Sequence, residues 1–362
     1  MKKFRVAFIG MDHIHVQTIA ADFMKYPEQA EIVGIADYPT YNATQAAYKK
    51  AHNFPKQDLT VWEDYKELLA QKIDIAVVTT NVRDHAACAV EILGMNIHTV
   101  VEKPMAFDLQ DARRMIEAYH NSRAELIINW PIAWFPSFNK AKALCDAGEI
   151  GRIMRVTYRS PATWGPFSYS KDGILPPDEE LDKTWWYHAD RGGGSILDYA
   201  CYGAALATWF FGKRAVKVKG VAHNFCVPAF DVEDYSAMLL DFGDGVGLLE
   251  GSWSTYNPGE IPSGPVIYGT EGTIVCDRHS TQVKIYKGRS HGPIPPAEVI
   301  ECGNTSPELN FGENIVKHLL EDAPLHPLLA PELNVDVMFA LDAGRADAGE
   351  PPVANGANIV SC

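Results

Sequence analysis

The first third of the chain alternates between short apolar runs and stretches in which apolar residues recur with helical spacing. The apolar runs predict strands, and the stretches between them predict helices. Strands that alternate with helices in this way indicate βαβ units, and hence a parallel sheet with helices on both faces. The predicted strands are Phe4–Ile9, Glu31–Ala36, Ile73–Val78, Ile97–Val101 and Leu126–Ile128, and the predicted helices are His13–Met24, Asn42–Ala51, Trp62–Ala70, His85–Leu93 and Asp108–Tyr119.

The pattern changes after about Asn129. A helix and an alternating strand lead into a long loop rich in Pro, Gly and aromatic residues, which is followed by another helix, a run of strands and two closing helices. Strands separated by turn residues at this spacing predict an antiparallel sheet. We therefore expect an α/β domain over residues 1–128 and an α+β domain with one large, mostly antiparallel sheet over residues 129–362. The predicted elements are helix Phe135–Ala147, strand Ile153–Tyr158, loop Ser160–His188, helix Ser195–Phe211, strands Val216–Val221, Tyr235–Phe242, Val246–Ser254, Val266–Gly269, Thr273–Cys276 and Val283–Tyr286, and helices Phe311–Leu320 and Glu332–Ala348.

Composition adds limits on partners and compartment. A length of 362 residues is typical of two domains, and 47% apolar residues is typical of a globular protein. The net charge of −14 argues against nucleic acid and anionic membranes as partners. There is no apolar run of about 18 residues, the N-terminus lacks a signal-peptide pattern, and the seven cysteines are scattered without a CxxC pair. These features predict a cytoplasmic protein.

The turn after the first strand is a degraded dinucleotide-binding fingerprint. The expected pattern is G-x-G-x-x-G between a strand and a helix, and here only its first glycine is kept, while Asp12 and His15 take the places of the other two. The order of strand, turn and helix still allows backbone N–H groups to meet a pyrophosphate. The Asp12 carboxylate would repel it unless that side chain turns away or caps the helix. The alternative is a strand–helix turn that binds nothing. The predicted cofactor contacts here are Gly10, Met11, Asp12, His13 and Ile14.

Two further features bear on the cofactor and on metals. Asp37 follows the second strand, where an acid accepts hydrogen bonds from the adenosine ribose and repels a 2′-phosphate. It favours NAD over NADP, unless it is simply a surface aspartate. His13 and His15 form an HxH pair, but no Cys or acid follows at a ligand spacing, so we predict no metal site.

Glu102-Lys103-Pro104 ends the fourth predicted strand of the parallel sheet. Ligands of open α/β sheets lie outside the carboxyl ends of the strands, so Lys103 is expected to face the reacting carbon of a bound substrate. Asn129 and Trp130 follow the last parallel strand and are expected near the nicotinamide.

A second constellation follows the glycine triplet Gly192–Gly194. Asp198 and Tyr202 are four residues apart in the predicted helix and would share one face. Tyrosine, with a pKa near 10, is a poor base at neutral pH, but a nearby lysine cation lowers that pKa. Lys103 and Tyr202 would then form a proton-transfer pair, with Asp198 as the orienting acid. The alternative is a buried helix with one capped acid and one packed tyrosine.

Together these motifs resemble the glucose–fructose oxidoreductase, inositol dehydrogenase and MocA family, over almost the whole chain. Additional similar segments are Cys145–Gly151, Tyr268–Thr273 and Asn334–Val353. The resemblance implies an N-terminal Rossmann domain and a C-terminal substrate-binding and oligomerisation domain. It also implies NAD(P)-dependent oxidation or reduction of sugars or cyclic polyols in a homodimer or homotetramer. Lys103 would be the catalytic lysine, Asp198 its partner and Tyr202 the acid/base.

Some positions refine or depart from the family pattern. Tyrosine rather than histidine at Tyr202 resembles the subgroup that contains glucose–fructose oxidoreductase, which points to a pyranose hydroxyl. Trp185-Trp186 replaces the usual Trp-Arg, which disfavours an acidic substrate. The Thr-Pro-Asn turn after the third strand of the sheet appears as Thr79-Thr80-Asn81. By resemblance, Thr79, Thr80, Asn81, His85 and Glu102 are expected to contact the cofactor.

The loop before the glycine triplet supplies candidate substrate contacts. Its aromatic rings would stack on a sugar, or else belong to the core or an interface; they are Trp164, Phe167, Tyr169, Trp185, Trp186 and Tyr187, with His188 and Arg191 as polar candidates. Three functions follow. The favoured one is an NAD-dependent sugar, glycoside or polyol dehydrogenase. A glycoside-cleaving enzyme that uses bound NAD for transient oxidation would need the same residues. A non-catalytic NAD sensor would have no use for Lys103, Asp198 and Tyr202.

Overall fold

The computed structural model describes residues 2–39, 50, 54–161, 165–167, 177–256, 260–277, 280–303 and 311–349. The chain forms two compact units. The first contains Met1–Trp130 and Pro307–Val335, and the second contains Pro131–Ser306 and Asp336–Cys362. Each unit is therefore built from two separate stretches of sequence. The predicted helix over Asn42–Ala51 lies, apart from residue 50, outside the described residues.

The first unit is built on a six-stranded parallel sheet with the order β3-β2-β1-β4-β5-β6. Connections from the central strands run in opposite directions on either side of the β1–β4 pair, which is the switch point of a doubly wound sheet. All four residues of β4 are buried, as expected for a strand that is covered on both faces. The strands are β1 (Phe4–Ile9), β2 (Ala30–Ala36), β3 (Val61–Trp62), β4 (Ile75–Val78), β5 (His98–Glu102) and β6 (Leu126–Asn129).

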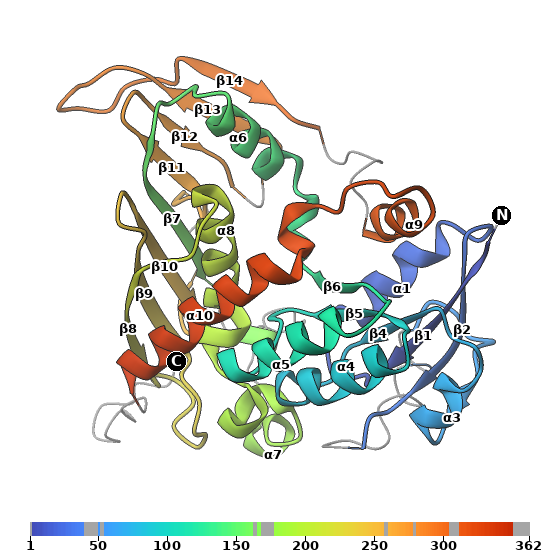
Figure 1. Ribbon diagram of the computed structural model, residues 1–362. Coiled ribbons are helices and arrows are strands. Elements are labelled where there is room, and N and C mark those ends of the chain that lie inside the picture. Colours follow the sequence, from blue (N-terminus) through green and yellow to red (C-terminus); the bar gives the residue numbers. More distant parts are fainter. Residues whose placement is uncertain are drawn as a thin grey trace. The chain divides into compact units, whose positions relative to one another are not determined.

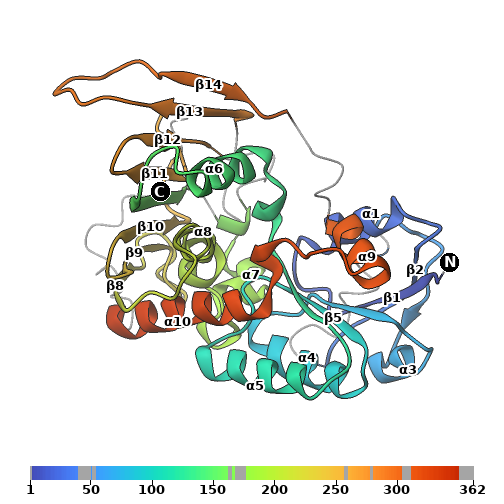
Figure 2. The ribbon, with the colours of Figure 1, turned by 45° about the horizontal axis from the view of Figure 1, so that its top comes forward.

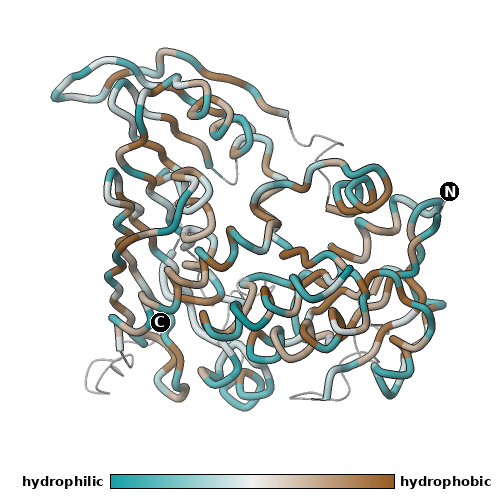
Figure 3. Tube along the Cα trace, viewed as in Figure 1, coloured by the Kyte–Doolittle hydropathy of each residue, from teal (hydrophilic) through white to brown (hydrophobic). Residues whose placement is uncertain are grey.

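Helices cover both faces of this sheet. α1 (Val16–Met24) and α9 (Phe311–Glu321) lie on one face, and α3 (Tyr65–Leu69), α4 (His85–Gly94) and α5 (Leu109–His120) lie on the other (Figures 1 and 2). The tube in Figure 3 shows hydrophobic colour along the central strands and hydrophilic turns in α5. This distribution is typical of amphipathic helices around a buried sheet, and it confirms the predicted α/β architecture.

The second unit is built on an eight-stranded sheet with the order β14-β13-β12-β11-β7-β10-β9-β8. The pair β7–β10 is parallel and the other pairs are antiparallel, which confirms a large, mostly antiparallel sheet. The strands are β7 (Ile153–Pro161), β8 (Lys217–His223), β9 (Tyr235–Asp241), β10 (Val246–Ser252), β11 (Val266–Gly269), β12 (Thr273–Val275), β13 (Gln282–Tyr286) and β14 (Glu298–Glu301).

Helices of the second unit pack on this sheet and on the loops around it. The longest is α10 (Pro331–Ala348), whose first residues belong to the first unit. In place of one helix from Ser195, the chain forms a π-helical turn, Ile196–Ala200, that continues as α8 (Cys201–Phe211). The backbone of this turn lies against Gly251 of β10. A Cβ at Gly251 would lie 2.5 Å from the Ala200 nitrogen, so only glycine leaves room for the turn. The remaining helices are α6 (Pro136–Asp146) and α7 (Asp178–Leu181).

Other boundaries differ from the sequence prediction for local reasons. The helix expected over Trp62–Ala70 begins only at Tyr65, because Asp64 caps it by accepting a hydrogen bond from the Lys66 N–H at 2.8 Å. The prediction was wrong for Trp62, which belongs to strand β3. The helix expected from His13 begins at Val16. Throughout the described ranges, the helices are all too short or too polar to cross a membrane.

Candidate cofactor and catalytic site

Gly10 sits where the turn after β1 passes closest to the turn after β4. Its φ is +71°, and a Cβ at this position would lie 2.3 Å from the Thr80 Cγ2 atom. The Asp12 N–H donates to the Thr79 carbonyl at 2.9 Å, which draws the two turns together. Only glycine both adopts this backbone conformation readily and fits into the space that Thr80 leaves. The first glycine of the fingerprint is therefore required by the structure itself.

Asp12 is turned toward the loop after β4. Its Oδ2 accepts hydrogen bonds from the backbone N–H of Asn81 at 2.9 Å and from the Asn81 side chain at 3.3 Å. Burial raises the pKa of Asp12 to about 6, against the opposing effect of the Asn81 hydrogen bonds. Of the two arrangements considered from the sequence, the carboxylate has turned away and does not cap α1, whose N-cap residue is His15.

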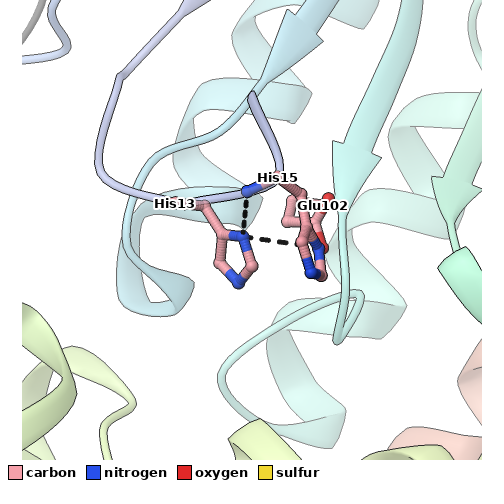
Figure 4. A group of neighbouring side chains, drawn as sticks. All are labelled: His13, His15 and Glu102. Atoms are coloured by element: carbon pink, nitrogen blue, oxygen red, sulfur yellow. Dashed lines mark hydrogen bonds and ion pairs between the residues drawn. The ribbon is translucent and has the colours of Figure 1, made fainter. Parts of the chain in front are cut away.

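His13, His15 and Glu102 form a cluster between the turn after β1 and the end of β5 (Figure 4). The Nδ1 atom of His15 lies 2.7 Å from Glu102 Oε1, and that of His13 lies 3.8 Å from the same oxygen. Burial by itself would raise the pKa of the fully buried Glu102. The nearby His15 and Lys103, together with a hydrogen bond from Asn129, instead bring it below its usual value. The carboxylate is therefore ionised at neutral pH.

The same three side chains offer ligand atoms within 4.8 Å of one another, a grouping that could hold a metal ion. The sequence prediction of no metal rested on the absence of an acid at ligand spacing, and Glu102 supplies that acid from a distant strand. However, two ligands at about 2.1 Å from one ion are about 3 Å or more apart, which exceeds the 2.7 Å between His15 and Glu102. The Nδ1 of His13 also accepts a hydrogen bond from the His15 N–H at 3.2 Å. These contacts favour a hydrogen-bonded histidine–carboxylate cluster over a metal centre.

His85 connects the turn after β4 to the loop that carries Lys103. One ring nitrogen lies 3.0 Å from the Pro104 carbonyl and the other lies 3.2 Å from the Thr80 carbonyl. Burial lowers the pKa of His85, which keeps the imidazole neutral. Lys103 directly follows β5 and is buried, with 2% of its surface exposed. A neutral imidazole has a single N–H and can donate to only one of these two carbonyls at a time, and Lys103 stands next to the first of them, that of Pro104.

Most of the remaining predicted cofactor residues lie along the same edge of the sheet. Asn129, at the end of β6, donates to Glu102 Oε2 at 2.7 Å. Asp37 follows β2 and is close enough to Asp12 to raise the pKa of that carboxyl further. Met11 is buried, whereas Ile14 is exposed. Trp130 is fully buried and its indole donates to Asn334 at 2.6 Å, which favours a structural role for this ring.

The second unit contains Asp198 and Tyr202. Asp198 is buried in the π-helical turn, and its Oδ2 accepts a hydrogen bond from the Trp253 indole at 3.2 Å. Tyr202 lies in the first turn of α8 and is half-buried. The spacing of four residues thus runs from a π turn into an α-helix. π-helical turns are frequent at functional sites, which supports the selection of this segment.

The predicted substrate contacts lie in the loop before this helix. The rings of Trp185 and Trp186 are buried and stacked, with centroids 4.8 Å apart. His188 Nε2 lies 2.7 Å from the Asp182 carbonyl, and the Arg191 Nε lies 3.7 Å from an Asp190 carboxylate oxygen. The positions of Trp164 and Tyr169 lie outside the described residues, as does the side chain of Phe167. Substrate roles for these residues stay predictions.

Two family models match the chain, one for each part. The model described as "Oxidoreductase family, NAD-binding Rossmann fold" matches residues 4–129, and the model described as "GFO/IDH/MocA C-terminal domain" matches residues 138–275. The chain belongs to the GFO/IDH/MocA family of oxidoreductases. It is therefore an NAD-binding enzyme with a Rossmann domain, as the sequence motifs predicted.

Individual relatives agree with this assignment. The chain is 27% identical over 220 residues to dTDP-3,4-didehydro-2,6-dideoxy-alpha-D-glucose 3-reductase of Streptomyces violaceoruber. The aligned region covers 60% of the chain but only 58% of the reductase. It is 21% identical to trans-1,2-dihydrobenzene-1,2-diol dehydrogenase of Oryctolagus cuniculus over 88% of the chain and 93% of that enzyme. The fold matches the WlbA dehydrogenase of Bordetella pertussis, solved with NADH and UDP-GlcNAcA, with a TM-score of 0.72 at 20% identity over 96% and 97% of the two chains.

The residues at the edge of the sheet fit the NAD of this GFO/IDH/MocA protein. The backbone around Gly10 leaves no space for a side chain, and α1 begins after the turn that follows β1, beside the β1–β4 switch point. Gly10 and the turn Asp12–His15 would hold the pyrophosphate. Asp37 would accept hydrogen bonds from the adenosine ribose. Asp12 fits because its carboxylate is turned toward Asn81 and accepts hydrogen bonds from the Asn81 backbone and side-chain N–H groups.

Glu233 and Trp253, two residues that hold the segment with Asp198 in place, were not found from the sequence. Glu233 accepts a hydrogen bond from the Ile196 N–H at 2.8 Å, and Trp253 donates to Asp198. Neither stands in a recognisable motif. They reach the helix only because β9 and β10 pair in register, with Ser252 opposite Tyr235.

Proposed function

We propose that this protein is an NAD-dependent dehydrogenase that oxidises a hydroxyl group of a sugar, glycoside or cyclic polyol. The observation that carries the proposal is Lys103, a buried lysine at the carboxyl end of β5, held beside the ionised Glu102 on the cofactor edge of a Rossmann sheet. Burying a lysine costs desolvation free energy, and a lysine that is buried beside a charged partner despite this cost is typical of a functional site. The substrate class follows from the names of the relatives, which act on a deoxysugar nucleotide and on a cyclic diol.

We assign the proton chemistry to Lys103, Asp198 and Tyr202. Bound NAD would supply the acceptor for the hydride that leaves the carbinol carbon. The proton of the substrate hydroxyl passes to the Tyr202 phenolate as the carbonyl forms, so Tyr202 becomes the neutral phenol and the oxidised product leaves uncharged at that oxygen. The Lys103 ammonium stabilises phenolate and the developing alkoxide. Asp198, fixed by Trp253, orients the hydroxyl group. Tyrosine in this role is the basis for proposing a pyranose hydroxyl.

The cofactor preference is assigned to Asp37. Its carboxylate lies beside Asp12 at the ends of β2 and β1. The Asp37 carboxylate would repel a 2′-phosphate at this place, so NADP should bind more weakly than NAD.

The substrate is proposed to be uncharged. The tandem Trp185-Trp186 lacks the arginine that would pair with an acidic group, and its two stacked indoles make this segment apolar. His188 and Arg191 would add polar contacts.

A homodimer or homotetramer is proposed through the second unit. Its sheet leaves an open apolar face on which Val221, Leu239 and Leu248 are 52%, 40% and 38% exposed. Contiguous exposed apolar residues on a sheet are typical of an interface. Sedimentation velocity of the wild type and of Leu239→Glu would test this, and a wild-type monomer would refute it.

The function is tested by NADH formation with a panel of sugars, glycosides and inositols. Lys103→Ala and Tyr202→Phe should each lower turnover by about 100- to 10,000-fold while NAD still binds. Lys217→Ala and Tyr256→Phe are matched exposed controls. Full activity of Tyr202→Phe would sink its assignment. Cleaved sugar without net NADH would support a glycoside-cleaving enzyme, and NAD binding with no turnover on any compound would favour a sensor.

A further inference from the structure

Glu233 holds the start of the helix that carries Asp198 and Tyr202. Its backbone carbonyl accepts a hydrogen bond from the Ser195 N–H at 2.9 Å, and its Oε1 accepts one from the Ile196 N–H at 2.8 Å. The first N–H groups of a helix have no partner within the helix, and Ser195 makes no side-chain cap of its own. Glu233 therefore provides the hydrogen-bond acceptors that a capping residue normally provides, although it lies in a different segment of the chain.

The chain before the helix is shaped around this carboxyl group. Gly194 has a φ of +99°, and a Cβ there would lie 2.5 Å from each carboxyl oxygen of Glu233. The third glycine of the triplet is thus required for contact with Glu233. The second is required elsewhere, because a Cβ on Gly193 would lie 2.2 Å from the Trp186 carbonyl oxygen. The carboxyl group and the triplet form one packed arrangement.

The next residue extends the same support to Asp198. The Asp234 carbonyl accepts a hydrogen bond from the Trp253 N–H at 2.6 Å, and the indole of Trp253 donates to Asp198 Oδ2 at 3.2 Å. The Asp234 carboxylate is itself held by the Phe225 N–H at 3.0 Å. Glu233 and Asp234 therefore fix the helix start and the ring that orients Asp198.

The charge of Glu233 is sensitive to pH near neutrality. Burial raises the pKa of its carboxyl to about 7, against the hydrogen bond from Ile196. The charged groups that act on it are Arg345 of α10, which lowers the pKa, and Asp234 of its own segment, which raises it. The ionised carboxyl makes a stronger, charge-assisted hydrogen bond to the Ile196 N–H than the neutral acid does.

We propose that Glu233 is a positioning residue, whose carboxylate fixes the start of the helix that presents Asp198 and Tyr202 to the substrate. The inference rests on the proposed roles of those two residues. A protonated Glu233 holds the helix start less firmly, so turnover should fall as the pH is lowered through about 7.

The first test compares kcat and KM as functions of pH for the wild type, Glu233→Gln and the exposed control Glu298→Gln. Glutamine keeps an acceptor oxygen but has no charge. We expect Glu233→Gln to lower kcat about tenfold at pH 8, where one charge-assisted bond is lost, to leave the KM for NAD unchanged and to remove the fall of kcat near pH 7. A Glu233→Gln enzyme with wild-type kcat and the wild-type pH profile would overturn the proposal.

The second test needs no variant. Amide hydrogen exchange of the peptide around residues 190–200 in the wild type, corrected for the intrinsic dependence on pH, should be faster at pH 6 than at pH 8. Equal corrected rates would overturn the proposed role. If exchange depends on pH but Tyr202→Phe is fully active, the support of the helix by Glu233 stands and the proposed catalytic roles fail.

Discussion

The Nδ1 atom of His15 lies 2.7 Å from Oε1 of the buried Glu102, so the turn after β1 is tied to the end of β5. Asn129 binds the other oxygen of the same carboxylate from β6. Three strand ends therefore meet at one carboxylate, immediately before Lys103. The chain has lost the third glycine of the dinucleotide fingerprint, and the histidine in its place provides this connection.

Removal of the carboxylate should destabilise the first unit. Glu102→Ala leaves His15 and Asn129 without their buried acceptor, and breaking a buried pair in this way costs about 3–5 kcal/mol. Urea unfolding at pH 7 would measure the loss, with Glu102→Gln expected to lose less. Lys25→Ala removes an exposed ion pair with Asp22 and should cost less than about 1 kcal/mol. Similar losses for Glu102→Ala and Lys25→Ala would contradict the importance of this contact.

Gly10→Ala should be damaging for reasons of space as well as of backbone conformation. Gly148 has a similar φ, +78° against +71°, but has nothing within 4 Å of its Cβ position. Gly148→Ala should therefore cost about 1–2 kcal/mol of conformational strain. Gly10→Ala should cost a further 1–3 kcal/mol or so for the overlap with Thr80, and should weaken NAD binding. Denaturant titrations and calorimetric NAD titrations would show the difference. Equal costs for the two variants would mean that the turn adapts freely.

The periodicity of the sequence was enough to predict both sheets and most helices, because the strands of the parallel sheet are buried runs and the helices are amphipathic. β14 was missed because Glu298–Glu301 is a short, charged edge strand that is recognisable only from its pairing with β13. The start of α8 was misjudged because the π turn depends on contacts with Gly251 and Glu233, which lie far along the chain.

Site residues that stand in a local motif at the end of a predicted strand were found from the sequence. Site residues that reach the site only through tertiary contacts were missed. Lys103 stands at a strand end in a local motif, and the structure places it directly after β5. The third member of the His13–His15 cluster could not be found from spacing, because Glu102 lies 87 positions beyond His15. Glu233 is missed for the same reason.

Asp12 should make stability depend on pH. Its pKa is about 6 in the folded protein against 3.8 for an ordinary aspartate, because burial disfavours its charge. Between these values the folded chain retains a proton that the unfolded chain has lost, so raising the pH favours unfolding, by about 3 kcal/mol once both forms are ionised. Asp12→Asn should lack this loss, so its stability relative to the wild type should increase from pH 4 to pH 8.

Unfolding free energies of the wild type, Asp12→Asn and the exposed control Glu31→Gln across that pH range would measure the effect. A constant difference between Asp12→Asn and the wild type would show that Asp12 ionises normally in the folded protein. Because the side-chain amide oxygen introduced by Asp12→Asn can still accept the hydrogen bond from the Asn81 N–H, the turn itself should be preserved.

Asp37 should set the preference for NAD. The carboxylate follows β2, where it would accept hydrogen bonds from the adenosine ribose and repel a 2′-phosphate. Asp37→Ala should weaken NAD binding and bring the ratio of the Kd values for NADP and NAD down by about tenfold or more, which corresponds to about 1.4 kcal/mol. Calorimetric titration with both cofactors measures the ratio, and Asp58→Ala, an exposed acid on the same unit, is the control. If the ratio is the same in Asp37→Ala and the wild type, the selectivity resides in another residue of the β2 end.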